Sequence, residues 1–137
     1  MGPIRPFLDA NVLYSAALDG PSFDLIWQLA KKRKVELVTN RTCRLEAKRN
    51  LDRKRPQQLG TFAALLADAR ELPDAKQLVP ADIDIAGKNA PVYATAVAAQ
   101  ADVLLTGDRK HFAHLMKRTD LPLRVRTVRD FLREGQP

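Results

Sequence analysis

Residues 103–112 read VLLTGDRKHF, and the prediction of the fold starts from this stretch. A short apolar run reaches Thr106, Gly107 lets the backbone turn, and Asp108 is followed directly by basic residues. Short apolar runs bounded by a glycine are typical of strands buried in a parallel sheet. The stretch therefore predicts an interior strand that carries an acid at its carboxyl end.

Strands and helices are expected to alternate along the rest of the chain. Further strands are predicted at residues 4–8, 35–39 and 124–126, with a short extended piece around Leu78 and Val79. Because parallel strands need helical crossovers, the alternation predicts an α/β fold. The expected architecture is a three-layer sandwich with a mostly parallel central sheet, in a single domain over residues 1–137.

The helices between these strands are predicted from apolar residues at helical spacing and from capping side chains. Ser22, Asn40 or Thr42, and Asn89 can each cap a helix, the last of these being alanine-rich and running to about residue 100. Further helices are expected near residues 62–69, 111–117 and 128–133.

Composition points to a globular protein with a packed core. Of the 137 residues, 45% are apolar and 28% are charged. No run approaches the roughly 20 apolar residues that cross a bilayer, and the N-terminus lacks the apolar core of a signal peptide. Cys43 is the only cysteine, which excludes an internal disulfide and predicts a buried thiol. A cytoplasmic protein with no membrane partner is therefore expected.

The net charge indicates a polyanionic partner. Twenty-three Lys and Arg against 16 Asp and Glu give a formal charge of +7. Net charge alone leaves open a second interpretation, in which the basic surface only maintains solubility. The basic residues nearest the predicted strand ends are Arg41, Arg44, Arg49, Arg53, Arg109 and Lys110.

Acidic and amide side chains fall where the strands end. Asp9 follows the first strand directly, Asp108 follows the strand at 102–106, and Glu46 lies one turn into the helix after the second strand. Asn89 begins another helix. Ligands bind beyond the carboxyl ends of parallel strands, because loops and helix N-termini converge there. If the two strands that precede Asp9 and Asp108 are neighbours, these side chains gather at one edge of the sheet.

Crowded carboxylates repel one another unless a cation lies between them. Mg²⁺ and Mn²⁺ prefer oxygen ligands, so such a cluster bordered by basic residues would suit a phosphodiester held over a metal ion. Simpler roles stay open for each residue. Asp9 can cap a helix that begins at Asn11, Asp108 can be a turn residue, and Glu46 can be a solvated helix residue.

Three segments together resemble the PIN-domain family, in particular small bacterial members of the toxin-antitoxin type: FLDANVLYSA at residues 7–16, RTCRLEAKRNL at 41–51 and KNAPVYATAVAAQADVLLTGDRKHF at 88–112. The resemblance implies an endoribonuclease that uses Mg²⁺ or Mn²⁺ held by Asp9, Glu46 and Asp108. Asn11 and Ser15 would support the first acid, and Thr106 would neighbour the last. RNA and an antitoxin protein are the implied partners, and a homodimer is left open.

The chain departs from the family pattern at two places. The position that begins the alanine-rich helix is usually Asp in the family, and here it is Asn89. A further acid that some members carry after the TGD segment is replaced by Lys110 and His111. The leading hypothesis is a metal-dependent ribonuclease with Asp9, Glu46, Asn89 and Asp108 at its catalytic site, weakened or inactive because of Asn89. The alternative is a PIN-like module that binds RNA or a protein and has lost catalysis.

Overall fold

A five-stranded parallel sheet forms the centre of the molecule. The computed structural model describes residues 2–18, 20–76, 79–85 and 87–134. Its strands lie in the order β3-β2-β1-β4-β5, and each neighbouring pair is parallel. Their bounds are β1 (Pro6–Leu8), β2 (Leu37–Asn40), β3 (Ala69–Leu72), β4 (Val103–Leu105) and β5 (Arg124–Arg126).

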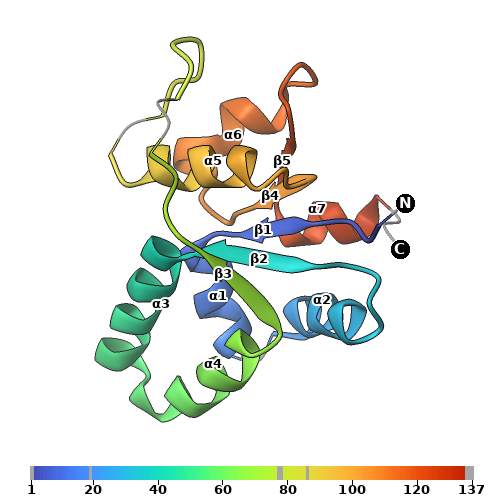
Figure 1. The fold of residues 1–137 in the computed structure, drawn as a ribbon. Coiled ribbons are helices and arrows are strands. Elements are labelled where there is room, and N and C mark those ends of the chain that lie inside the picture. The colour runs from blue at the N-terminus through green and yellow to red at the C-terminus, as the bar shows by residue number, and fades with distance from the viewer. Residues whose placement is uncertain (1, 19, 77–78, 86, 135–137) are drawn as a thin grey trace.

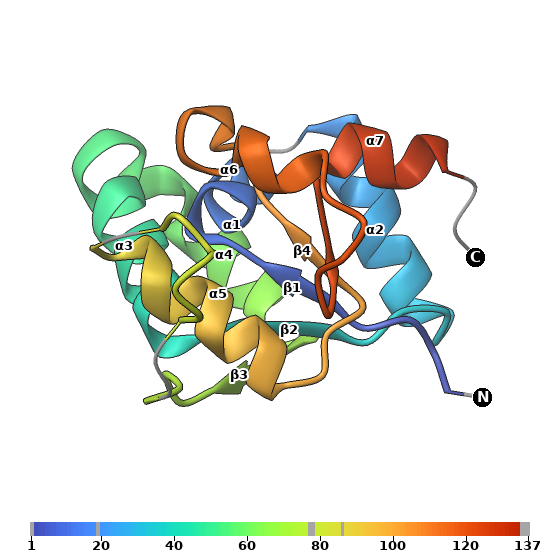
Figure 2. The ribbon, with the colours of Figure 1, turned by 90° about the horizontal axis from the view of Figure 1, so that it is seen from above.

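Helices cover both faces of this sheet, which gives three layers. Figure 1 shows α5 and α6 on one side of the sheet and α1, α3 and α4 on the other, and Figure 2 shows the same layers from above. The helices are α1 (Ala10–Ala17), α2 (Pro21–Lys31), α3 (Arg41–Lys54), α4 (Leu59–Leu66), α5 (Asn89–Ala98), α6 (Arg109–Met116) and α7 (Val128–Arg133), with a short 3₁₀ turn, η1 (Pro56–Gln58), before α4. The predicted α/β sandwich with a parallel central sheet is confirmed.

The two central strands place the ends of distant segments side by side. β1 and β4 pair in register through Phe7 and Leu104, both fully buried. The backbone N–H of Asp9 donates to the carbonyl of Leu105 at 3.1 Å, so the pairing continues to the first acid. The carboxyl ends of β1 and β4 therefore meet at one edge of the sheet. Within the described residues, no helix is long and apolar enough to span a bilayer.

The third strand lies elsewhere than the sequence predicts. The apolar spacing predicts a helix through residue 69, but Ala69–Leu72 form β3, an edge strand beside β2. The extended piece predicted around Val79 is not a strand in the structure, and Leu78 lies outside the described residues. Only one side of β3 pairs with another strand, and Arg70 and Glu71 are exposed. Such a strand lacks the apolar pattern that identifies buried strands.

Two of the predicted helix caps are also corrected. Helix α2 begins at Pro21 with Gly20 as its N-cap, so Ser22 lies inside the helix, and proline at the first position suits its fixed φ. Asn89 is the first residue of α5 rather than its cap, a position that Lys88 takes without a side-chain hydrogen bond. Of the two candidates for α3, Asn40 is the cap, because its side chain accepts from the N–H of Cys43 at 2.9 Å.

Candidate functional site

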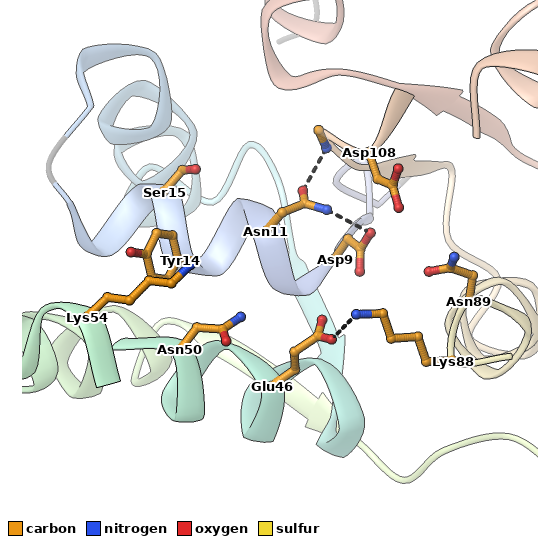
Figure 3. A pocket seen from close by; sticks show the side chains of 11 residues that line it. Asp9, Asn11, Tyr14, Ser15, Glu46, Asn50, Lys54, Lys88, Asn89 and Asp108 are labelled. Carbon is orange, nitrogen blue, oxygen red and sulfur yellow. Dashed lines mark hydrogen bonds and ion pairs between the residues drawn. The ribbon is translucent and has the colours of Figure 1, made fainter. Parts of the chain in front are cut away.

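A polar cavity of about 360 Å³ opens at the carboxyl ends of β1 and β4. Figure 3 shows the carboxylates of Asp9, Glu46 and Asp108 and the amide of Asn89 directed toward it from four different segments. The residues that line it are Asp9, Asn11, Tyr14, Ser15, Glu46, Asn50, Lys54, Lys88, Asn89, Gly107 and Asp108. The structure thus brings the four proposed catalytic residues around one cavity, and their roles stay predictions.

Asp9 caps a helix and also faces the cavity. Its Oδ1 accepts from the N–H of Ala10 at 2.7 Å at the start of α1, and its Oδ2 accepts from the Thr106 hydroxyl at 2.7 Å. The buried thiol of Cys43 lies behind it, with Sγ 3.7 Å from Oδ1. The residue is 4% exposed. Capping and facing the cavity, which the sequence offered as alternatives, therefore coexist.

Asn11 and Thr106 connect the two aspartates through hydrogen bonds. The Asn11 side chain donates to Oδ2 of Asp9 at 3.1 Å and accepts from the N–H of Gly107 at 2.6 Å. The Thr106 hydroxyl also accepts from the N–H of Asp108 at 3.1 Å. These bonds fix the turn after β4 against the start of α1, so the positions of both acids depend on Asn11 and Thr106. Ser15, the other predicted support, lies on the cavity wall one turn further along α1.

Asp108 caps α6 and remains partly open to solvent. Its Oδ1 accepts from the N–H of His111 at 3.1 Å, and its Oδ2 lies 2.8 Å from His111 Nδ1. The Asp108 side chain is 24% exposed, whereas that of His111 is 51% exposed. The acid at the start of α6 can therefore bind a ligand in the cavity without leaving its capping position.

Burial makes the charge on Asp9 unfavourable. Desolvation raises the pKa of the Asp9 carboxyl, the negative charge of Glu46 adds to the rise, and hydrogen bonds from Thr106 and Ala10 oppose it. An ionised Asp9 therefore lowers the stability of the metal-free fold, and a cation in the cavity would relieve that cost.

We expect the stability of the metal-free protein to fall as pH rises because of Asp9. The pKa of this carboxyl is raised in the folded state, so its protonated form favours folding. That contribution to the free energy of unfolding is complete below the unfolded pKa near 3.8 and is lost as pH rises through the folded pKa. The measurement is the melting temperature of the parent and of Asp9→Asn in EDTA between pH 4 and pH 7. The melting temperature of the variant relative to that of the parent should rise with pH. A relative melting temperature that does not depend on pH would contradict the prediction.

Glu46 is carried into the cavity by α3. The Asn40 side chain fixes the start of that helix through two hydrogen bonds. Its Oδ1 accepts from the N–H of Cys43, and its Nδ2 donates to the Thr95 hydroxyl of α5 at 3.3 Å. Glu46 forms an ion pair with Lys88, which lies just before α5. The pair joins α3 to the residue before α5 across the cavity (Figure 3).

Sequence reasoning missed several residues of the cavity wall. Asn50 and Lys54 follow Glu46 at four-residue spacing on α3, a signal that could have identified them. Lys88 and Lys54 are the cations that line the cavity, rather than the predicted RNA-binding residues. Of the latter, Arg44 is paired with Glu71, whereas the remaining five are exposed: Arg41, Arg49, Arg53, Arg109 and Lys110.

The donor set of the cavity suits a hard divalent cation. Carboxylate and amide oxygens are the ligands that Mg²⁺ and Mn²⁺ prefer, and the burial of Asp9 favours a positive charge beside it. In the part of the chain that the structure describes, no three side chains of His, Cys, Asp and Glu converge closely enough to hold an ion as they stand. Side-chain rotations would be needed to complete a coordination shell.

The fold and the chain both match known proteins. The model of the PIN domain matches residues 5–110. A chain of VapBC2 from Rickettsia felis, solved bound to a DNA fragment from the promoter, has a TM-score of 0.67 and 15% identity, over 89% of this chain and 97% of that one. PAE2754 from Pyrobaculum aerophilum has a TM-score of 0.64 and 17% sequence identity, over 98% of this chain and 91% of that one.

A third structure is similar in the same way. VapC20 of Mycobacterium tuberculosis, a toxin that cleaves the sarcin-ricin loop, has a TM-score of 0.58 and 13% identity, over 80% of this chain and 94% of that one. None of the curated proteins matches with significance. At these identities the solved structures establish a shared fold, and the match of the domain model over most of the sequence establishes the family. The chain therefore belongs to the PIN-domain family.

Proposed function

We propose that this chain is a metal-dependent endoribonuclease of the toxin type, with Mg²⁺ or Mn²⁺ as its cofactor. The observation that carries the proposal is the cavity at the sheet edge, where three carboxylates and an amide are directed toward one space that Lys54 and Lys88 also line. The PIN-domain match supports a nuclease, and the likeness to VapC20 supports RNA as the substrate. One domain over residues 1–137 carries the activity in this proposal.

In this proposal Asp9 and Asp108 are the principal metal ligands. Glu46 faces them from α3 and contributes directly or through water. A bound ion would activate a water molecule and stabilise the leaving oxygen of the cleaved phosphodiester. Asn11 and Thr106 hold the two aspartates in position, and Lys54, at the other end of the cavity, is placed to contact a phosphate group.

An antitoxin protein is the proposed partner. The structural relatives include a VapBC2 assembly and a toxin-antitoxin complex from Klebsiella pneumoniae. A ribonuclease of this kind would damage the RNA of its own cell unless another protein covered the cavity. The cavity, together with the exposed Arg49 and Arg53 beside it on α3, is the region such a partner would have to cover.

The proposed activity is tested by incubating the purified chain with a labelled cellular RNA pool. Cleavage should appear with Mn²⁺ and disappear with EDTA. Cleavage that persists in EDTA would contradict a metal-dependent mechanism. No cleavage at millimolar Mn²⁺, together with retained RNA binding, would favour the second candidate function, a PIN-like binding module without catalysis. That alternative is motivated by the neutral Asn89 and the cationic Lys88 in the cavity wall.

The exposed arginines of α3 are expected to carry part of the RNA affinity. Arg49 and Arg53 each lie three residues after a residue of the cavity wall, Glu46 and Asn50, and so are their neighbours on the helix surface. Substituting both with Gln should weaken binding of single-stranded RNA. It should also lower the slope of log K against log salt by about 0.7 for each phosphate group that the variant no longer neutralises.

A matched control for this charge change lies at the opposite end of the sheet. Lys32 and Lys34 are exposed and precede β2, whereas the cavity lies beyond its carboxyl end. Replacing both with Gln removes the same charge without touching the proposed RNA surface. Equal salt slopes for the two double variants would show that Arg49 and Arg53 are solvated surface residues that do not contact RNA.

A further inference from the structure

Lys88 lines the acidic cavity and is paired there with one of the three carboxylates. Its ammonium donates to Oε1 of Glu46, which is 42 positions earlier in the chain, and Figure 3 shows the two side chains directed toward each other. The Glu46 side chain is 26% exposed and that of Lys88 is 67% exposed. The contact is therefore held by charge and not by packing of the lysine stem.

The ammonium also interacts with the other two acids of the site. The hydrogen bond and the charge of Glu46 raise the pKa of Lys88, and the charges of Asp9 and Asp108 raise it further. Lys54, the other cation of the wall, lies beside Tyr14 and Asn50 at the far end of the cavity (Figure 3). Lys88 is thus the cation placed among the proposed metal ligands.

Charge balance at this end of the cavity suits one divalent ion. The three carboxylates carry three negative charges and the ammonium of Lys88 carries one positive charge, which leaves two. One Mg²⁺ or Mn²⁺ neutralises that remainder. An ion that also recruited Glu46 would have to share that carboxylate with the ammonium of Lys88, and the repulsion between the two cations grows as the site loses water.

We propose that Lys88 is a positioning residue that keeps Glu46 out of direct contact with the metal ion, so that Asp9 and Asp108 hold the ion directly and Glu46 contributes through water. The proposal rests on the proposed function, because it assumes that the cavity binds a divalent cation. It assigns to the residue before Asn89 a direct effect on the metal affinity of the site. A neutral side chain at position 88 would release Glu46 to become a ligand.

The test is a double-mutant cycle on Mn²⁺ affinity, measured by calorimetric titration and by the EPR signal of free Mn²⁺. The variants are Lys88→Gln, Glu46→Gln and the combination, with Lys88→Arg as the control that keeps the charge. Lys88→Gln should tighten Mn²⁺ binding about tenfold, and Lys88→Arg should behave like the parent. Glu46→Gln should change the affinity of the parent less than about threefold but loosen that of Lys88→Gln about tenfold.

Two results would overturn the inference. One is a tenfold loss of affinity on Glu46→Gln in the parent, because Glu46 would then already be a ligand. The other is an unchanged affinity in Lys88→Gln. Both leave metal binding itself intact and so differ from the failure of the proposed function, in which bound Mn²⁺ supports no RNA cleavage. Absence of Mn²⁺ binding in all variants would remove both proposals. Melting temperatures in EDTA verify that each variant is folded.

Discussion

Asp108→Asn is expected to reduce RNA cleavage at least about a hundredfold while leaving the fold almost unchanged. The amide oxygen can still accept from the N–H of His111, so the cap of α6 is retained. The charge that would face the metal ion is removed, and a hundredfold decrease corresponds to about 2.7 kcal/mol of transition-state stabilisation, within the range of metal-assisted catalysis. Initial cleavage rates in Mn²⁺ and melting temperatures in EDTA measure the two effects.

A carboxylate that accepts a hydrogen bond from a helix N–H away from the cavity provides the control for that variant. Asp74 accepts from the N–H of Thr42 at 3.2 Å in the first turn of α3 and does not line the cavity. Asp74→Asn should leave cleavage close to that of the parent. In cells without a partner protein, the parent should slow growth and Asp108→Asn should relieve the effect. Equal growth inhibition by both chains would point to a cause other than metal-dependent cleavage.

The placement of Asp9 and Asp108 was predictable because Asp9 directly follows the short buried strand β1 and Asp108 lies in the turn after the short buried strand β4. Once β1 and β4 are neighbours, the two acids have no other place than the same edge of the sheet. The last strand and helix, at residues 124–126 and 128–133, were also predicted with the bounds that the structure has. In each case the local sequence pattern and the tertiary environment agree.

The features that the sequence did not predict depend on contacts between distant segments. β3 was missed because Arg70 and Glu71 are exposed, and the strand therefore lacks the apolar pattern of a buried strand. It forms a strand through its pairing with β2, which the local sequence does not indicate. Lys88 was not singled out, since nothing in the local sequence indicates that it meets Glu46 on another helix. The net positive charge directed attention to the arginines, although lysines line the cavity. Net charge indicates the class of partner but does not identify the side chains that contact that partner.

Asn89→Asp is expected to raise both the Mn²⁺ affinity and the cleavage rate about tenfold or more. Asn89 is 7% exposed, faces the cavity and is the first residue of α5. A carboxylate there adds a negative charge beside the proposed ion, and a tenfold gain in affinity needs only about 1.4 kcal/mol net of desolvation. Without metal, an acid in the first helical turn is favoured by the helix dipole but repelled by Asp9 and Asp108. These effects oppose each other, so the melting temperature in EDTA should change little.

A second amide on the same cavity wall separates a specific ligand effect from a general electrostatic one. Asn50 lies on α3 beside Lys54, away from Asp9 and Asp108 in Figure 3, and Asn50→Asp adds the same charge to the cavity. Its effect on Mn²⁺ affinity should be several-fold smaller, because the added charge does not reach the coordination shell and is screened by water and by Lys54. Equal gains in the two variants would show that any carboxylate in the cavity suffices. If Asn89→Asp cleaves no faster than the parent with Mn²⁺ in excess, the missing carboxylate does not limit the site, and the neutral side chain at position 89 would have to be explained by binding rather than by catalysis.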